Sequence, residues 1–327
     1  MKTVRHQPTS NVAVASTGGA LFIDILGIGE LTRGNIPISV DTVSAITDLS
    51  SVPQESINHY LAVYLQTSFR NILATVKNAC PSINIAQLSD CAFLWCADLD
   101  VLTEASSKLM FGLTKKGILC RGGLGYGEIL TPYNDGNESL GKFVMGSAVT
   151  NAATYEKLGK GCRIFTSPDF ALEFGNLHSK SIFYPFLFHP HTIPTDYTYL
   201  DEYRWYLLPT LDILNGTVIF PFEMAKEAML QSADLVCTLF HSPLMKWNVA
   251  NEHGCRHIAA SIEAITSGMS HATNPHDRRG HNLNDFCMSA EIVIEAIRER
   301  DDALYSRRYE SFKRVINEIN FNNLYPV

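Results

Sequence analysis

The chain has 327 residues, of which 46% are hydrophobic and 18% charged, and its formal net charge is −7 at pH 7. This length is enough to bury a large core, and we expect two structural units. The acidic balance argues against nonspecific binding to nucleic acid, and no apolar run reaches the ~18 residues that span a bilayer. The N-terminus also lacks the apolar stretch of a secretion signal. We therefore expect a cytoplasmic protein that binds neither nucleic acid nor membrane.

Candidate strands and helices alternate through the first half of the chain. An apolar strand is predicted at 20–28, followed by an amphipathic helix at 51–79, where Ser51 and Gln54 have the spacing of a capping box. A hairpin is predicted at 83–97, with Asp90 at its turn. The later elements are a helix at 98–117, a glycine-interrupted strand at 118–130, a helix at 148–161 and a strand at 162–167. This order predicts an α+β fold in which helices cover a mostly antiparallel sheet.

From about residue 221 the pattern becomes helical. Helices are predicted at 222–241, 253–267 and 290–319, with a turn-rich surface loop at 270–285. We therefore divide the chain into a first domain at 1–215 and a helical C-terminal region at 216–327. The eight cysteines are scattered without a CxxC pair, which indicates reduced thiols. His253, Cys255 and His257 have metal-like spacing, but without a further ligand pair an ordinary helix surface is favoured.

Asp24 is the one charge in the apolar run 21–29, where an unpaired carboxylate costs several kcal/mol. It could cap a loop or pair with a buried arginine such as Arg121. A glycine-rich turn follows it at once, and Asp90 lies at the junction of two later strands, although an aspartate there is also ordinary turn chemistry. Two carboxylates on neighbouring strands beside such a turn can hold divalent cations over a triphosphate. We favour this metal-binding interpretation.

Three stretches carry a resemblance, in order along residues 20–167: "LFIDILGIGELT", "QLSDCAFLW", and "CRGGLGYGEI" followed by "GKFVMGSAVTNAATYEKLGKGCRIFTS". They resemble the metal-binding and helix motifs of the class III nucleotide cyclases. The resemblance implies a ferredoxin-type core and a lyase that forms a 3′,5′-cyclic nucleotide. In that reaction the ribose 3′-oxygen attacks the α-phosphorus and pyrophosphate leaves.

Carried over by position, the resemblance implies a metal site and a phosphate site. Asp24, Asp90 and the backbone carbonyl of Ile25 would bind two Mn²⁺ or Mg²⁺ ions. Backbone amides of the turn would bind the phosphates, namely those of Gly27, Ile28 and Gly29. The site would form at the interface of a head-to-tail homodimer.

The chain departs from the family at the residues that steady the transition state. The usual asparagine and arginine align with Thr150 and Thr154, while Asn151 lies one place off and fits only in a shifted register. Loss of one such donor reduces rate ~10²–10³-fold. Lys142 or Lys157 could compensate.

The base-reading positions depart as well, falling near Asn84 or Ala86 and at Phe143. Phe143 removes a hydrogen-bond acceptor and fills volume, which favours a small base stacked on its ring, although Phe143 could equally be a core residue. This pattern is similar to the pyrimidine cyclases of bacterial anti-phage (Pycsar-type) signalling, whose product activates an effector protein. We predict UTP as substrate; the alternatives are CTP, then ATP or GTP, then a degenerate cyclase fold that binds nucleotide or only dimerises as a scaffold.

Overall fold

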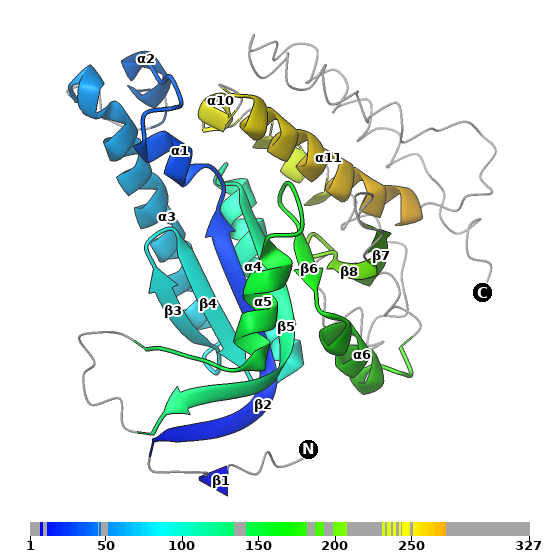
Figure 1. The fold of residues 1–327 in the computed structure, drawn as a ribbon. Helices are drawn as coiled ribbons and strands as arrows, with labels where there is room; N and C mark the ends of the chain where they lie inside the picture. Colours follow the sequence, from blue (N-terminus) through cyan, green and yellow to red (C-terminus); the bar gives the residue numbers. More distant parts are fainter. Residues whose placement is uncertain are drawn as a thin grey trace, which may run out of the picture.

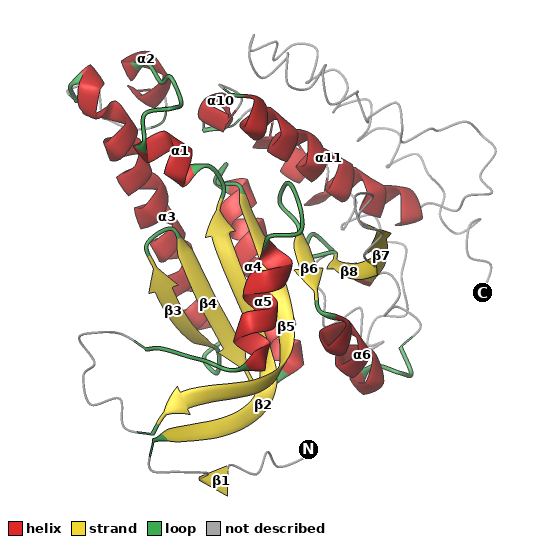
Figure 2. Cartoon of the chain, viewed as in Figure 1, coloured by secondary structure: helices red, strands yellow, loops and turns green. Residues whose placement is uncertain are grey.

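The computed structural model describes residues 7–8, 12–44, 46, 52–133, 142–181, 187–192, 199–207 and, within 231–272, all but 233, 237, 240, 241, 243, 249 and 250. Within these residues, the strands form one mixed sheet with helices on both of its faces (Figures 1 and 2). No helix in this part of the chain is long and apolar enough to cross a membrane.

The core of the sheet comes from two strand–helix–strand units. Its four strands are β2 (Ala13–Ile25), β3 (Asn84–Leu88), β4 (Cys91–Cys96) and β5 (Cys120–Pro132). The helix between β2 and β3 is α3 (Ile57–Ala79), and the helix between β4 and β5 is α4 (Leu99–Lys115). The strand order β3-β4-β2-β5, with every pair antiparallel, is the ferredoxin-type arrangement. The predicted α+β fold class is thus confirmed.

Further elements extend the sheet on both sides of this core. The additional strands are β1 (Gln7–Pro8), which pairs with β2, then β6 (Ile164–Thr166), β7 (Phe188–Thr192) and β8 (Tyr199–Tyr203). β6 runs parallel to β5, and β8 and β7 follow it in antiparallel pairs. The remaining helices are α1 (Ile28–Thr32), α2 (Val40–Ser44), the 3₁₀ turn η1 (Gln54–Ser56), α5 (Ser147–Glu156), α6 (Pro168–Leu177), α10 (Met245–Asn248) and α11 (Glu252–Ala272).

The two faces of the sheet are covered differently. Alternate residues of β2, such as Leu21 and Ile23, point into the main core beneath α3 and α4. Their neighbours Ala20 and Phe22 point to the opposite face, where α5 lies over β5 and β2 (Figure 1). Asp24 continues this second alternation. The face that carries Asp24 is therefore the one only partly covered by α5.

Three glycines of β5 let α5 approach the sheet closely. A Cβ atom at Gly123 would overlap the carbonyl oxygen of Ala152, and one at Gly125 would overlap that of Ala148. Gly127 faces the Oγ of Ser147 in the same way and has a φ of 146°, which side chains rarely adopt. Close helix packing thus explains the glycines that interrupt the strand predicted at 118–130.

Several local predictions hold, and others shift. The hairpin is confirmed, with Ser89 and Asp90 between its strands, and the helix predicted at 98–117 is α4, capped by the Asp98 side chain. β2 starts well before residue 20 because it pairs with β5 along its whole length. The predicted capping box is not formed by Gln54, whose amide instead donates to the Ile38 carbonyl and accepts from the Val40 N–H.

The helix predicted at 253–267 is confirmed as α11, whose buried residues Ile258, Ile262 and Ile265 join the main core. Figure 1 shows α11 crossing the end of the sheet near α1 and β6. The helix predicted at 290–319, and most of the loop predicted at 270–285, lie outside the described residues. The division at 215 and 216 remains a prediction.

Filling the glycine stripe should destabilise the fold. We expect Gly123→Ala and Gly125→Ala each to lower the free energy of unfolding by about 1–3 kcal/mol, because α5 must move to admit the new methyl group. Urea unfolding measures this. The control is Gly29→Ala, whose added Cβ would meet only Arg33 at 3.9 Å. Unchanged midpoints for both β5 variants would contradict the close packing.

Candidate active site

Asp24 lies at the end of β2, between two neighbouring strands. It is paired across the sheet with Cys91 of β4 and Arg121 of β5. Its side chain is half-buried on the face that α5 covers. The apolar strand therefore delivers a carboxylate to a partly enclosed position that solvent still reaches.

Asp90 is brought to Asp24 by the β3–β4 turn. Ser89, with φ 59°, allows the tight turn that precedes Asp90. The backbone N–H of Ile25 donates to the carbonyl oxygen of Asp90 at 3.0 Å, which ties this turn to the end of β2. Two segments far apart in the sequence thus meet at one end of the sheet.

Negative charge is in excess around Asp24. Burial, together with the nearby carboxylates of Glu156 and Asp90, raises the pKa of Asp24 from 3.8 to about 7, against an opposing effect of Arg121. Burial and the carboxylates of Asp24, Asp90 and Glu156 raise the pKa of the Cys91 thiol to about 11. A positive charge at this place would therefore be strongly favoured.

Arg121 does not fill that need alone. Its Nε–H donates to the carboxylate of Glu156, the last residue of α5, which is only 3% exposed. The guanidinium is therefore shared with an acid that itself disfavours the ionisation of Asp24. No sequence pattern pointed to Glu156, because an acid on a short helix normally indicates the solvent side.

The turn after Asp24 begins a short helix, α1. Gly27 has a φ of 87°, which requires glycine, and it precedes Ile28 and Gly29 at the start of α1. The first N–H groups of a helix have no acceptor within it, so this turn can present them to an anion. The predicted phosphate-binding residues therefore begin directly beside Asp24, Asp90 and Ile25.

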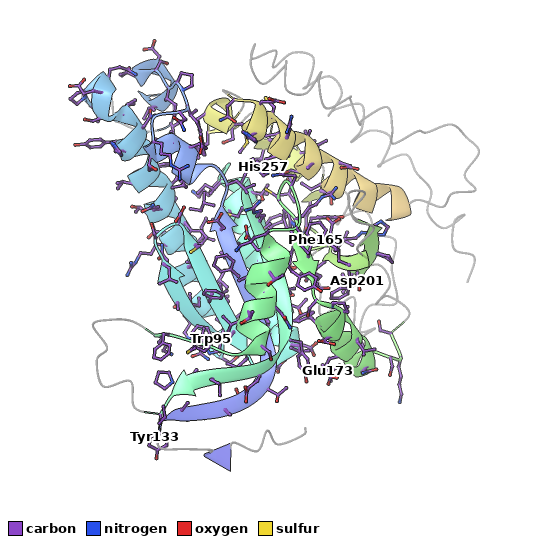
Figure 3. The ribbon with its side chains drawn as sticks, viewed as in Figure 1. Trp95, Tyr133, Phe165, Glu173, Asp201 and His257 are labelled. Carbon is purple, nitrogen blue, oxygen red and sulfur yellow. The ribbon has the colours of Figure 1, made fainter. Side chains whose placement is uncertain are left out.

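The C-terminal helices border this turn, which sequence reasoning missed. The ring of the buried Trp247 packs against Gly27, and Trp247, Glu30 and His253 line a small cavity of about 270 Å³. His257 also lines this cavity, and its Nδ1 accepts from the Gly161 N–H at 3.0 Å. Burial and nearby positive charges lower the pKa of His257 to about 4 (Figure 3).

The donor set at Asp24 and Asp90 fits a hard divalent cation. Both are carboxylates, and relieving their mutual repulsion is what a bound cation would do. Among the described residues, no group of three or more His, Cys, Asp or Glu side chains is placed to hold a metal ion. A cation here would need oxygens from the backbone, a nucleotide or water as well, as the implied Ile25 carbonyl and a triphosphate supply.

The predicted base-reading residues gather at the other end of the same sheet face. Asn84 and Phe143 line an open pocket of about 440 Å³ together with Trp95 and Lys142 (Figure 3 labels Trp95). Lys142 Nζ donates to Asn84 Oδ1 at 3.0 Å. Ala86, the alternative to Asn84, is buried in the apolar cluster beneath α5. Phe143 is 54% exposed, so its ring can be reached.

This pocket is distant from the carboxylates within one chain. Trp95 pairs with Ala20, four residues before Asp24, which corresponds to ~13 Å along the strand. Ser16, another lining residue, lies ~26 Å from Asp24 by the same rise. A larger open pocket of about 720 Å³ lies between α1 and the start of α3, and none of the predicted site residues line it.

Helix α5 connects the two ends of the face. Thr150 is exposed and Asn151 is half-buried against β5, where its Nδ2 donates to the Tyr126 carbonyl at 3.4 Å. The hydroxyls of Thr150 and Thr154 donate to helix carbonyls one turn earlier. Lys157 is exposed at the end of α5. Of the two residues weighed for the asparagine role, Thr150 is the more accessible.

Comparisons with known proteins find relatives only among solved structures. A guanylyl cyclase, Cya2, has 13% identity and a TM-score of 0.38 over 58% of this chain and 91% of its own. The monomeric guanylyl cyclase domain of the RhoGC fusion protein from the aquatic fungus Blastocladiella emersonii has 11% identity and a TM-score of 0.39, covering 59% and 97%. The adenylyl cyclase CyaB from P. aeruginosa has 13% identity and a TM-score of 0.35, covering 58% and 94%.

No protein-family model matches the sequence, and no curated protein matches it. The similar structures are guanylyl and adenylyl cyclases, but at these identities and TM-scores they carry no conclusion about activity. We therefore base function on the residues of the site.

The raised pKa of Asp24 gives a pH-dependent stability. Between about pH 4 and pH 7 the folded chain holds a proton on Asp24 that the unfolded chain has released, so stability falls as pH rises through this window. Asp24→Asn lacks this loss. We expect its free energy of unfolding, without metal, to exceed that of the wild type increasingly up to about pH 7 and by a constant amount above it.

Urea titrations of both proteins across this pH range measure the difference. Parallel stability profiles would show that the Asp24 carboxyl ionises as freely as in the unfolded chain.

Proposed function

We propose that the chain is a nucleotide cyclase that converts UTP to 3′,5′-cyclic UMP and pyrophosphate. In this proposal the product is a second messenger of anti-phage defence that activates an effector protein. The single observation that carries the cyclase assignment is the joining of β2 to the β3–β4 turn through the Ile25–Asp90 backbone hydrogen bond. It holds two carboxylates together beside a positive-φ glycine turn.

The reaction needs the ribose 3′-oxygen, the α-phosphorus and the metal ions in one place. The ribose 3′-oxygen forms a bond to the α-phosphorus, and the bond from that phosphorus to the bridging oxygen breaks, so that pyrophosphate leaves with the electron pair. Two Mn²⁺ or Mg²⁺ ions, when bound, would lower the pKa of the 3′-hydroxyl, whose proton passes to solvent, and neutralise the phosphates. Asp24 and Asp90 would hold these ions, and the turn from Gly27 to Gly29 would orient the triphosphate.

Separation of the two half-sites supports a homodimer. The carboxylate end and the base pocket lie at opposite ends of one sheet face, and α5 lies over the β5 and β2 part of it. Three large apolar side chains remain exposed, namely Leu88, Phe143 and Met145. A second copy placed head to tail on this face would bring the carboxylates of one protomer to the base pocket of the other.

Pocket composition supports a pyrimidine substrate. Phe143 offers an exposed ring for stacking, and among the described residues that line the pocket none has a carboxylate to pair with adenine or guanine. CTP is the next candidate, followed by the purine nucleotides.

One observation favours a degenerate scaffold as a second candidate. Thr150 and Thr154 stand where the family has asparagine and arginine, and both hydroxyls are bound to helix carbonyls. Against this, a scaffold would gain nothing from Asp24, a carboxylate whose ionised form is disfavoured by its surroundings.

Turnover of the four nucleoside triphosphates with Mn²⁺ tests the proposal directly. We expect cyclic UMP as the main product by chromatography, and Asp24→Ala and Asp90→Ala to lower its rate by at least ~10²-fold. The matched control is Asp41→Ala, an exposed aspartate on α2. No cyclic product from any nucleotide would leave the scaffold, and full activity of either carboxylate variant would place the metals elsewhere.

Mixing two inactive variants tests the shared site. Asp24→Ala disables one half of each site, and a double variant, Asn84→Ala with Phe143→Ala, disables the other. In a mixed dimer one of two sites is intact, so an equal mixture should recover about a quarter of wild-type turnover. A mixture no more active than its components would show that each chain works alone.

A further inference from the structure

Among the described residues, the polar side chains that line the base pocket are mostly hydrogen-bond donors and hydroxyls, and the other lining residues are apolar. Its polar side chains are those of Ser16, Ser82, Asn84, Trp95, Cys96, Thr131 and Lys142. Lysine and tryptophan can only donate, serine and threonine can do both, and asparagine has one donor and one acceptor end. Cys96 donates its thiol to the Ser82 carbonyl. The asparagine amide is therefore the group whose orientation decides what the pocket offers.

Lys142 fixes that orientation. Its Nζ lies 3.0 Å from Asn84 Oδ1, and because an ammonium group has no lone pair, the atom that faces it must be the amide oxygen. The acceptor end of Asn84 is thus occupied, and its Nδ2 and the remaining protons of Lys142 are left as donors.

Hydrogen-bond donors in the pocket favour a base that carries carbonyl oxygens. Uracil presents oxygens at both C2 and C4, whereas cytosine has an amino group at C4 that needs an acceptor. Placing an amino group against Nδ2 and the ammonium would set donor against donor and leave the amino group without an acceptor, which disfavours binding. Hydroxyls such as those of Ser16 and Thr131 can accept from the N3–H of uracil.

Building on the proposed function, we propose that Lys142 is the residue that selects uracil over cytosine, by holding the Asn84 carbonyl so that the pocket presents donors to the base. Lys142 acts here both through Asn84 and as a donor itself.

An isosteric substitution gives the sharpest test. In Asn84→Asp one carboxylate oxygen keeps the bond to Lys142, while the other presents an acceptor in place of Nδ2. We expect this variant to shift the ratio of kcat/KM for UTP over CTP toward CTP by at least about tenfold. Lys142→Met frees the amide to turn and should lower the ratio in the same direction, while Lys142→Arg, which keeps a donor, should retain UTP preference.

The control is Lys180→Met, an exposed lysine beyond α6 that should leave the ratio unchanged. Binding of UTP and CTP to the full chain in EDTA, measured by calorimetry, provides a readout that does not need turnover. Tighter binding of UTP than of CTP by the wild type, with the reverse order in Asn84→Asp, would support the role of Lys142 even if no cyclic product forms. The lack of product would then refute only the cyclase assignment.

Two results would overturn it. Turnover of UTP with an unchanged UTP-to-CTP ratio in both Asn84→Asp and Lys142→Met would refute the role of Lys142 while the cyclase assignment stands. A wild-type preference for CTP would refute the donor pocket itself.

Discussion

Crowding of negative charge at the end of β2 is the constraint on which the site depends. Burial, together with the nearby carboxylates of Glu156 and Asp90, raises the pKa of Asp24 to about 7. The Ile25–Asp90 backbone hydrogen bond prevents the turn from moving away to relieve this repulsion. Arg121 offsets part of it but is bound to Glu156. A fold that maintains such an arrangement is prepared for a cation, because cation binding converts the repulsion into attraction.

Helix α5 connects the charged end of β2 to the rest of the sheet face. The glycines of β5 draw the helix onto one side of the face, and its last residue, Glu156, thereby reaches Arg121. Its first residue, Ser147, is held to β5 because its Oγ accepts from the Glu128 N–H. The helix therefore lies over β5 and β2, and its two ends are fixed by contacts with β5.

Much of this arrangement was predictable from local patterns, and the remainder depends on long-range contacts. Asp24 was recognisable as a charge in an apolar run, and the hairpin around Asp90 by its turn chemistry. Glu156 was not, because its burial results from the close approach of α5. The elements α6, β7 and β8 were missed, since β7 and β8 are short and gain their stability from pairing with each other and with β6. Gln54 matched a capping signal but bonds instead to the chain before α2, a partner remote in sequence.

The C-terminal helices add a further restraint that no sequence pattern indicated. Trp247 packs on Gly27, which its positive φ already restricts to glycine, so the turn is fixed both by its own backbone and by a ring from far along the chain. The Nδ1 of His257 accepts a hydrogen bond from the Gly161 N–H, and the charge of Arg121 contributes to the lowered pKa of His257. The turn after Asp24 and the loop before β6 are thereby both braced by the α10–α11 segment. Because α11 also contributes Ile258 and Ile262 to the main core, displacement of this segment would disturb the Gly27 turn and expose apolar surface at the same time.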